Sequence, residues 1–321
     1  MNSPLLELLR CPRCRGTLAG TGLPLARASC SCCGKEFQVA RGALRLAGSA
    51  GDYTESFGRQ WNRYDVARPA EDDAVFRVKT GVTADSLAGK LVLDAGCGGG
   101  RYARLAAQAG ARVIGVDLST AVEKAATLCA PYPNSLIAQA DLLNLPVEER
   151  VFDMVYSIGV LHHTPAPRVA FSQVARCVRP GGRLSVWLYR QNTPPQEWIN
   201  SALRALAGRL SPRLLENLCA GLGLVGSVPV INRTLNKVVN FSNHPDWTLR
   251  VCDNFDWYAP AYQSHHTVEE LKRWFHEEGF ADPVELAPEK SGPVYDWAHR
   301  HGLIIGGGVN LTALRGTTAH A

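Results

Sequence analysis

The stretch from Leu91 to Gly100, with sequence LVLDAGCGGG, decides the fold of this chain. Its first half, LVLDA, is apolar except for one acid and is typical of a short buried parallel strand. Its second half is a glycine turn, and the residues from Arg101 to Ala109 have helical composition until Gly110 ends the helix. Such a unit binds nucleotides, because glycines let the backbone approach the ligand and the helix N-terminus presents free N–H groups.

The glycine pattern and the next acid narrow the ligand class. Counted from Gly96 and Gly98, the third glycine of a dinucleotide fingerprint would stand at position 101, which is arginine. A second strand, RVIGVD, ends in Asp117, 23 positions after Asp94. Doubly wound folds place a carboxylate on a ribose diol at about this spacing. The glycine loop alone could also be a structural tight turn. The residues downstream decide between a nucleotide-binding loop and such a turn.

The downstream residues continue the alternation of strands and helices. Ser119 is a candidate N-cap for a helix that ends at Ala130. The expected elements after it are strands over 135–138, 152–157 and 183–189, a helix over 167–177, and a turn over 179–182.

Five segments follow one another along the core: LDAGCGGG, VIGVDLS, QADLLNLP, FDMVYSIGVLHH and VRPGGRLSVWLY. In this order they resemble the type 11 family of class I methyltransferases, which use S-adenosylmethionine (SAM). The resemblance covers residues 89–189 and implies a Rossmann-like, seven-stranded α/β sheet. It also implies which residues bind SAM: Gly96, Gly98 and Gly100 at the methionine part, Asp117 at the ribose, Asp141 and Leu142 at the adenine, with Asp94, Cys97, Leu118 and Ser157 as further contacts.

The N-terminal segment carries a metal-ligand pattern. Cys11 and Cys14 form one C-x2-C pair and, 15 residues later, Cys30 and Cys33 form a second, as in zinc ribbons. Four thiolates around Zn²⁺ make a closed site, which is structural rather than catalytic, and Cys32 is the spare thiol. The segment from Leu5 to Leu46 also resembles the Trm112-like ribbon.

Charge is concentrated in the same segment. Residues 1–50 contain seven Lys or Arg against two Glu, a balance of +5, which leaves 27 against 27 in the rest of the chain. Two interpretations are open: the arginines neutralise a zinc-thiolate centre, which we favour, or the ribbon binds RNA. The ribbon's single aromatic side chain, Phe37, is a poor stacking platform for RNA.

Composition adds further limits. The 46% hydrophobic content supports a sizeable core. No secretory signal is visible, and the longest charge-free stretch of the second half, Asn217 to Asn232, is too short and broken to span a bilayer. We therefore expect a cytoplasmic protein without a membrane partner, whose ten cysteines are thiols or metal ligands.

Aromatic spacing and leucine patterns organise the remaining segments. Tyr53 to Tyr64 predicts a helix that packs on the sheet or closes the SAM pocket, with Gln60 or an aromatic residue on the cofactor. Two amphipathic helices, broken at Ser211-Pro212, predict either a lid over the acceptor or a homodimer interface. The expected units are a ribbon (1–48), a linker with N-terminal helices (49–88), the SAM-binding core (89–190), the lid (191–262), a C-terminal helix with the last strands of the core (263–310), and a flexible tail (311–321). The last strands are expected near 283–286 and 302–305.

Methyl transfer requires that the acceptor atom is positioned against the methyl group. When the acceptor is a hydroxyl, a base must also remove its proton. His265 or His266, just before a helix capped by Thr267 and Glu270, is the first candidate, His163 the second, and Tyr262 a residue that orients the substrate. The fourth strand is followed by SIGV, not by the Asn/Asp-Pro-Pro-aromatic pattern of nucleic-acid amino-methylases, and no Pro-Cys nucleophile occurs. These features favour methylation of an O, N or C atom of a small, partly apolar metabolite, in secondary metabolism. An RNA methyltransferase and a SAM-binding protein without methylating activity are the alternatives.

Overall fold

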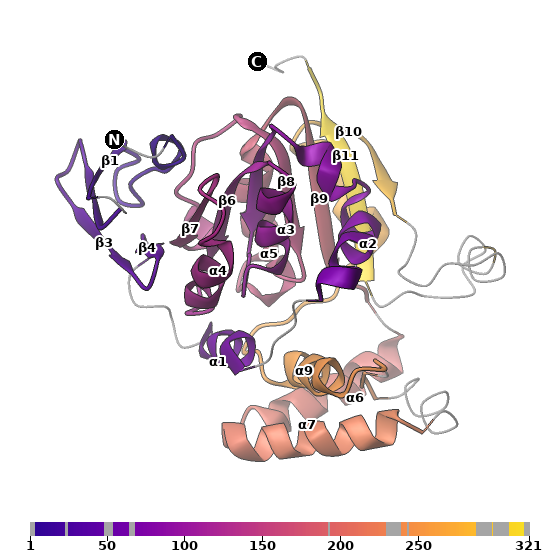
Figure 1. Cartoon of the computed structure of the whole chain (residues 1–321). Coiled ribbons are helices and arrows are strands. Elements are labelled where there is room, and N and C mark those ends of the chain that lie inside the picture. Colours follow the sequence, from indigo (N-terminus) through magenta and orange to yellow (C-terminus); the bar gives the residue numbers. More distant parts are fainter. Residues whose placement is uncertain are drawn as a thin grey trace.

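A mixed β-sheet between two layers of helices forms the centre of the computed structural model, which describes residues 4–22, 25–47, 54–63, 68–191, 193–228, 239–242, 244–286, 297 and 308–317 (Figure 1). Seven strands follow the order β7-β6-β5-β8-β9-β11-β10. The first five are parallel, and β11 is antiparallel to both β9 and β10. This arrangement confirms the predicted Rossmann-like fold. The bounds are β5 Leu91–Ala95, β6 Arg112–Asp117, β7 Ser135–Gln139, β8 Phe152–Ile158, β9 Val178–Tyr189, β10 Phe280–Glu285 and β11 Gly308–Arg315.

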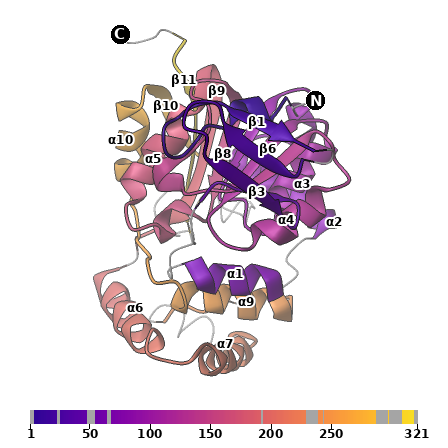
Figure 2. The ribbon, with the colours of Figure 1, turned by 90° about the vertical axis from the view of Figure 1, so that its left-hand side faces the viewer.

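The central strand β5 is buried along its whole length because helices cover both of its faces. Its side chains alternate, so that Leu91, Leu93 and Ala95 join one buried cluster and Val92 joins another. The first cluster includes α5 (Pro167–Arg176) and α10 (Val268–Glu277), and the second includes α2 (Pro69–Thr80), α3 (Arg101–Gln108) and α4 (Val122–Cys129). Figure 2 shows these two groups of helices on opposite sides of the sheet.

The N-terminal ribbon extends this sheet. Its strands are β1 Leu18–Thr21, β2 Arg27–Cys30, β3 Glu36–Ala40 and β4 Ala43–Arg45, and β4 pairs in parallel with β7, which gives eleven strands in all. Leu6, Leu9 and Phe37 belong to the same buried cluster as β5. The ribbon therefore shares its hydrophobic core with the sheet.

Arginines of the ribbon bind the core of the protein. Arg15 donates to the carbonyl oxygens of Leu145 (2.6 Å) and Val147 (3.0 Å). Arg41 and Arg45 both bind the carboxylate of Glu123 at 2.6 Å, on α4. Arg10 pairs with Glu148. These contacts give the ribbon's positive charge a structural role different from the thiolate neutralisation that we expected.

Three helices of the insertion and one N-terminal helix form a separate layer beneath the carboxyl ends of the strands (Figure 1). They are α1 (Glu55–Arg63), α6 (Pro194–Ala207), α7 (Pro212–Gly226) and α9 (Trp247–Tyr258). The predicted break before α7 is confirmed: Ser211 accepts a hydrogen bond from the N–H of Leu214 and Pro212 follows. Helix α9, which we did not predict, packs against α7 in one buried cluster.

Two expectations about local structure are wrong. Ser119 is not the N-cap, because α4 begins at Val122 and the Ser119 hydroxyl donates to Asp117. Residues 311–315, which we placed in a flexible tail, belong to β11, whose pairing with β9 buries Leu311. Tyr53, Tyr64 and the strand expected at 302–305 lie outside the described residues. Within those residues, no helix is long and apolar enough to span a bilayer.

Candidate active site

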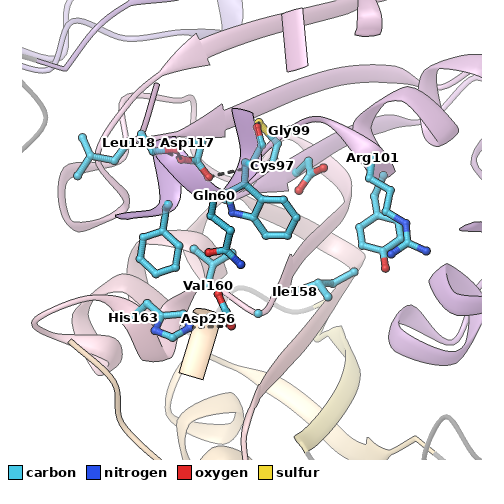
Figure 3. A pocket seen from close by; sticks show the side chains of 18 of the residues that line it. Gln60, Cys97, Gly99, Arg101, Asp117, Leu118, Ile158, Val160, His163 and Asp256 are labelled. Carbon is cyan, nitrogen blue, oxygen red and sulfur yellow. Dashed lines mark hydrogen bonds and ion pairs between the residues drawn. The ribbon is translucent and has the colours of Figure 1, made fainter. Parts of the chain in front are cut away.

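A cavity of about 270 Å³ lies at the carboxyl ends of β5, β6 and β8, between the sheet and helices α1 and α9 (Figure 3). Open α/β sheets bind their ligands at this edge. The glycine loop and the acids that follow β5, β6 and β7 line one end of the cavity. The other end is lined by aromatic and acidic residues of β9, α1 and α9, including Phe57, Trp187, Tyr189 and Asp256. The site thus has a polar cofactor end and a mainly aromatic end under the lid.

The glycine loop requires glycine at two positions for different reasons. Gly96 has φ +93°, and a Cβ there would lie 2.4 Å from the side chain of Val160 across the cavity. Gly100 has φ +84°, and its Cβ would lie 2.7 Å from the Cα of Ala125, so it allows α3 to pack on α4. Of the loop residues expected at the cofactor, Gly96, Cys97 and Gly98 line the cavity, and Gly99 does so in place of Gly100.

Asp117 at the end of β6 is held as a hydrogen-bond acceptor at the cavity wall. Its Oδ2 accepts from the N–H of Gly98 (2.9 Å), and its Oδ1 accepts from the N–H (2.8 Å) and the hydroxyl (2.7 Å) of Ser119. Burial raises the pKa of Asp117, and these hydrogen bonds oppose the rise. The carboxylate keeps lone pairs for a ligand diol.

The neighbouring part of the cavity wall is attached to the ribbon. Arg45 donates to Gln139 Oε1 (3.0 Å), and Gln139 Nε2 donates to the carbonyl oxygen of Leu118 (2.8 Å). Leu118, Asp141 and Leu142 all line the cavity. The ribbon strand β4 therefore helps to position the loop that follows Asp117.

Asp94 is buried at the end of β5 and lines the cavity. Its Oδ2 has no hydrogen-bond partner among the described residues. Burial raises the pKa of Asp94 to about 8. An unpaired buried carboxyl oxygen costs free energy, and the ammonium group of a methionine part would satisfy it, so this residue fits SAM.

The buried Asp94 should make the ligand-free protein less stable as the pH rises. Its pKa is about 3.9 in an unfolded chain and about 8 in the folded one, so the folded state prefers the protonated form. The contribution of Asp94 to the free energy of unfolding is most favourable below pH 4. It decreases between pH 4 and 8 by up to about 1.4 kcal/mol per pH unit. We expect Asp94→Asn to be more stable than the parent at pH 8 and the difference to shrink at pH 6, as measured by urea unfolding. Equal differences at the two pH values would contradict this assignment.

Two residues of α1 connect the lid with the glycine loop. Gln60 is buried and lines the cavity, and its Nε2 donates to the carbonyl oxygen of Cys252 on α9 (3.2 Å). The indole of Trp61 approaches Gly98, because a Cβ on that glycine would lie 3.5 Å from the ring. Ser157, by contrast, is absent from the cavity lining, and its hydroxyl donates to the carbonyl oxygen of Ala95 (2.7 Å).

His163 lies at the end of the cavity under the lid, beside Asp256 of α9 (Figure 3). Its Nδ1 donates to the carbonyl oxygen of Tyr262 (3.0 Å), which leaves Nε2 as the nitrogen that can accept a proton. Nε2 is 3.6 Å from Asp256 Oδ2, and Asp256 also accepts a hydrogen bond from the hydroxyl of Tyr189. Burial alone would raise the pKa of Asp256, but its interactions with His163 and Tyr189 hold it below the ordinary range. The dyad combines an oriented imidazole with a carboxylate that stays charged.

The other predicted acceptor residues do not line the cavity. His265 is bound at both ring nitrogens, by Glu197 (2.6 Å) and Gln263 (3.0 Å). His266 is bound by Glu270 (3.1 Å) and Ser264 (2.8 Å). The side chain of Tyr262 is 44% exposed, and its carbonyl group rather than its ring contacts His163. The structure therefore brings His163 to the site and leaves these three residues outside its wall.

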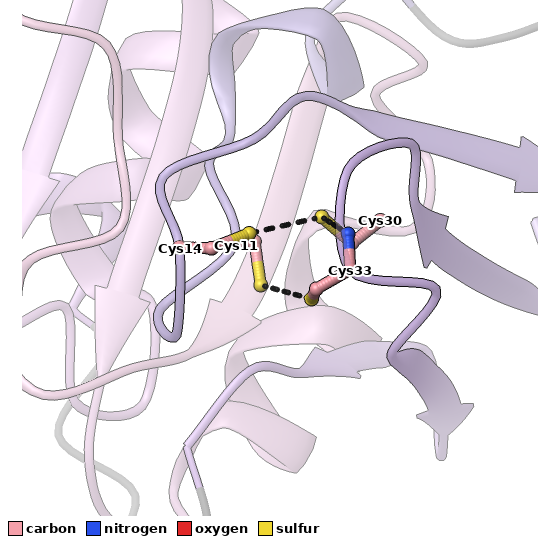
Figure 4. A group of neighbouring side chains, drawn as sticks. All are labelled: Cys11, Cys14, Cys30 and Cys33. Atoms are coloured by element: carbon pink, nitrogen blue, oxygen red, sulfur yellow. Dashed lines mark hydrogen bonds between the residues drawn. The ribbon is translucent and has the colours of Figure 1, made fainter.

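The four predicted metal ligands come together in the ribbon (Figure 4). The sulfur atoms of Cys11, Cys14, Cys30 and Cys33 all lie within 4.8 Å of one another, with 3.7 Å between Cys11 and Cys33 and 3.4 Å between Cys14 and Cys30. Zinc–sulfur bonds of about 2.3 Å in a tetrahedron place sulfurs about 3.8 Å apart. The cluster therefore fits a structural zinc ion, and the exposed Cys32 lies outside it.

The sequence of the core decides the family of this domain. Residues 93–186 match the model of a family described as a methyltransferase domain. Over these residues the chain is similar to methyltransferase domains. The match begins at the last residues of β5 and ends within β9, so it contains the glycine loop, Asp117 and His163 of the site.

Relatives of the methyltransferase domain are similar over part of their length. A ubiquinone biosynthesis O-methyltransferase from Dechloromonas aromatica is 33% identical over 153 residues, which cover 46% of this chain and 64% of that relative. One from Thiobacillus denitrificans is 34% identical over 134 residues, which cover 40% and 57%. The matched region thus spans less than two thirds of either relative.

Solved structures are more distant from the chain. A complex between the Haloferax volcanii Trm112 methyltransferase activator and a putative methyltransferase is 14% identical, with 85% of this chain and 100% of that chain covered and a TM-score of 0.46. A Haemonchus contortus phosphoethanolamine N-methyltransferase 2 is 17% identical, with 83% and 58% covered and a TM-score of 0.46. Likenesses below a TM-score of 0.5 establish neither fold nor function.

The cavity is also lined by residues to which the sequence analysis gave no role by name. Asp256, Trp187 and Gly99 line the cavity without having been named as functional residues, and Trp61 was expected only as one of the aromatic residues that could contact the cofactor. The helical spacing from Phe57 to Trp61 was a usable signal for Trp61. Asp256 had none, because its partner His163 is 93 positions away and α9 was not predicted.

Proposed function

We propose that this chain transfers a methyl group from SAM to an oxygen atom of a small, partly apolar metabolite. The observation that carries the proposal is that His163 and Asp256 both line the cavity, with Nε2 of the imidazole 3.6 Å from Oδ2 of the carboxylate. A hydroxyl acceptor must lose a proton during transfer, whereas many nitrogen acceptors need no such base. The relatives named as O-methyltransferases support oxygen as the acceptor atom.

Residues of the glycine loop and the strand ends would hold SAM. The orphan oxygen of Asp94 suits its ammonium group, Asp117 suits its ribose diol, and Leu118 with Leu142 provides an apolar wall for its adenine. When bound, SAM supplies an electrophilic methyl group on a sulfonium. Trp61 of α1 lies next to Gly98, where it covers the loop and limits the access of water.

His163 acts as the general base in this proposal. The carbonyl group of Tyr262 fixes its tautomer, so Nε2 receives the hydroxyl proton. Asp256 then stabilises the imidazolium that results, because it is negatively charged at neutral pH. The aromatic rings of Trp187 and Tyr189 provide an apolar surface for the acceptor. Catalysis otherwise depends on the alignment of acceptor and methyl group.

The cofactor assignment predicts that Asp117→Ala binds SAM at least tenfold more weakly. The substitution removes the carboxylate at the ribose position and also the acceptor that holds Gly98 and Ser119 in place. Isothermal titration calorimetry measures the affinity, with Asp85→Ala, an exposed position away from the cavity, as the matched control. Equal affinity in the two variants would refute the assignment.

Transfer of label from methyl-tritiated SAM tests the function itself. The zinc-loaded protein is incubated with a small-molecule extract of its source and, separately, with total RNA. We expect label in the extract alone, as an alkali-stable methyl ether. Label only in RNA would favour an RNA methyltransferase, and no transfer by protein that still binds SAM would indicate a non-methylating role. The engagement of Arg10, Arg15, Arg41 and Arg45 with the core argues against an RNA-binding ribbon.

A further inference from the structure

The outer surface of α6 and α7 is unusually apolar. Of the thirteen large hydrophobic side chains that are exposed among the described residues, seven lie between Trp198 and Val228, in these two helices and just after them. They are Trp198, Ile199, Leu206, Leu214, Leu218, Leu224 and Val228, and the most exposed is Trp198 at 75%. We call this set the lid stripe. Large apolar side chains exposed in such a concentration on neighbouring segments are typical of an interaction site.

The lid stripe lies on the side of the helices that faces away from the protein. Leu203 and Ala207 of α6 and Leu215 and Cys219 of α7 pack in the buried cluster with α9, and on α7 the two buried residues lie on a different side from Leu214 and Leu218. On α7, the stripe residues Leu214 and Leu218 follow helical spacing of four positions, and Val228 lies just after the helix. Figure 1 shows both helices at the pole of the molecule opposite the C-terminal end of the chain. In the described part of the chain, the seven stripe residues are thus exposed and do not belong to the buried cluster.

The charges around the lid stripe have one sign. Arg209 and Arg213, in and next to the turn between the two helices, are both exposed. The acidic residues of the same helices are engaged elsewhere: Glu197 binds His265, and Glu216 binds Arg63. Within the described part of α6 and α7, exposed formal charge is thus positive only.

We propose that the lid stripe binds the surface of an anionic lipid bilayer, with α6 and α7 lying in the interfacial plane. Amphipathic helices that combine leucines, an interfacial tryptophan and basic residues bind such surfaces. A second copy of the chain fits this face less well, because a two-fold contact would cover both pairs of arginines without an exposed acid on the same face to pair them. The proposal concerns attachment to one leaflet and adds to the methyl transfer proposed above.

Cosedimentation of the zinc-loaded full chain with sucrose-filled vesicles tests the proposal. Vesicles of phosphatidylcholine and phosphatidylglycerol at 7:3 should bind the chain, and vesicles of phosphatidylcholine alone should bind it about tenfold more weakly, because two arginines lose their attraction. The double variant Leu214→Glu/Leu218→Glu should reduce the partition coefficient at least thirtyfold, since two leucines no longer enter the interface. Arg209→Gln/Arg213→Gln should bind both vesicle types equally.

Val284→Glu is the matched control, because Val284 is 57% exposed on β10, outside the lid. It should bind anionic vesicles within twofold of the parent. No binding of the parent to anionic vesicles, or equal binding by the Leu214→Glu/Leu218→Glu variant, would overturn the proposal. Light scattering after gel filtration identifies the competing occupant: a dimer that this double variant converts to a monomer, without vesicle binding, would assign the stripe to self-association. Each result is independent of SAM binding and methyl transfer.

Discussion

Replacement of His163 by glutamine should lower kcat for methyl transfer by about two to four orders of magnitude and leave SAM affinity within twofold of the parent. General bases contribute about 10²- to 10⁴-fold, and glutamine keeps much of the volume of the ring without a basic nitrogen. Asp256→Asn should cost less, about tenfold to a hundredfold, because it removes the charge that stabilises the imidazolium but keeps the base. Single-turnover transfer of tritiated methyl groups measures both effects.

His265→Gln and His266→Gln provide the controls for this prediction. Both histidines are bound at both ring nitrogens and lie outside the cavity wall, so their replacement should change kcat less than threefold. A loss of activity in either control that exceeds the loss in His163→Gln would return the role of base to the residues just before α10. Calorimetry with SAM on all variants separates a chemical defect from a damaged cofactor site.

The cofactor end of the site was predictable because its signals are local. The glycine loop, the strand before it and Asp117 follow one another within 27 residues, and each has a short-range sequence pattern. The four cysteines were predictable for the same reason, since their two pairs have fixed spacing. Ser157 shows the limit of this reasoning: its place near the end of β8 agrees with the expected strand, but its hydroxyl donates to the carbonyl oxygen of Ala95 on β5.

The acceptor end was less predictable because it is made by contacts between distant segments. His163 follows β8, Asp256 lies on α9, and Gln60 comes from α1, so only the packed lid brings them together. His265 and His266 were attractive because aromatic residues and a helix cap stand next to them. In the structure Glu270 supplies its backbone N–H to Thr267 and its carboxylate to His266, so this cap stabilises α10.

Loss of the zinc ligands should destabilise the whole protein as well as the ribbon. We expect Cys14→Ser to release the metal and to lower the melting temperature by at least about 10 °C, because ribbon side chains such as Leu6, Leu9 and Phe37 share the core of the sheet. SAM affinity should fall severalfold, since the contact from Arg45 through Gln139 to Leu118 starts at the strand that joins the ribbon to β7. Differential scanning fluorimetry, metal analysis and calorimetry measure the three quantities.

Cys32→Ser is the matched control, because Cys32 lies in the same knuckle but is exposed and outside the cluster. It should keep one zinc ion per chain, the parent's melting temperature and its SAM affinity. Zinc content and melting temperature that stay unchanged in Cys14→Ser would mean that the four cysteines do not hold a structural metal. Metal loss with an unchanged melting temperature would instead mean that the buried leucines and the pairing of β4 with β7 hold the ribbon without the ion. In that case SAM affinity should stay near the parent value, because the position of Arg45 depends on β4 rather than on the knuckles.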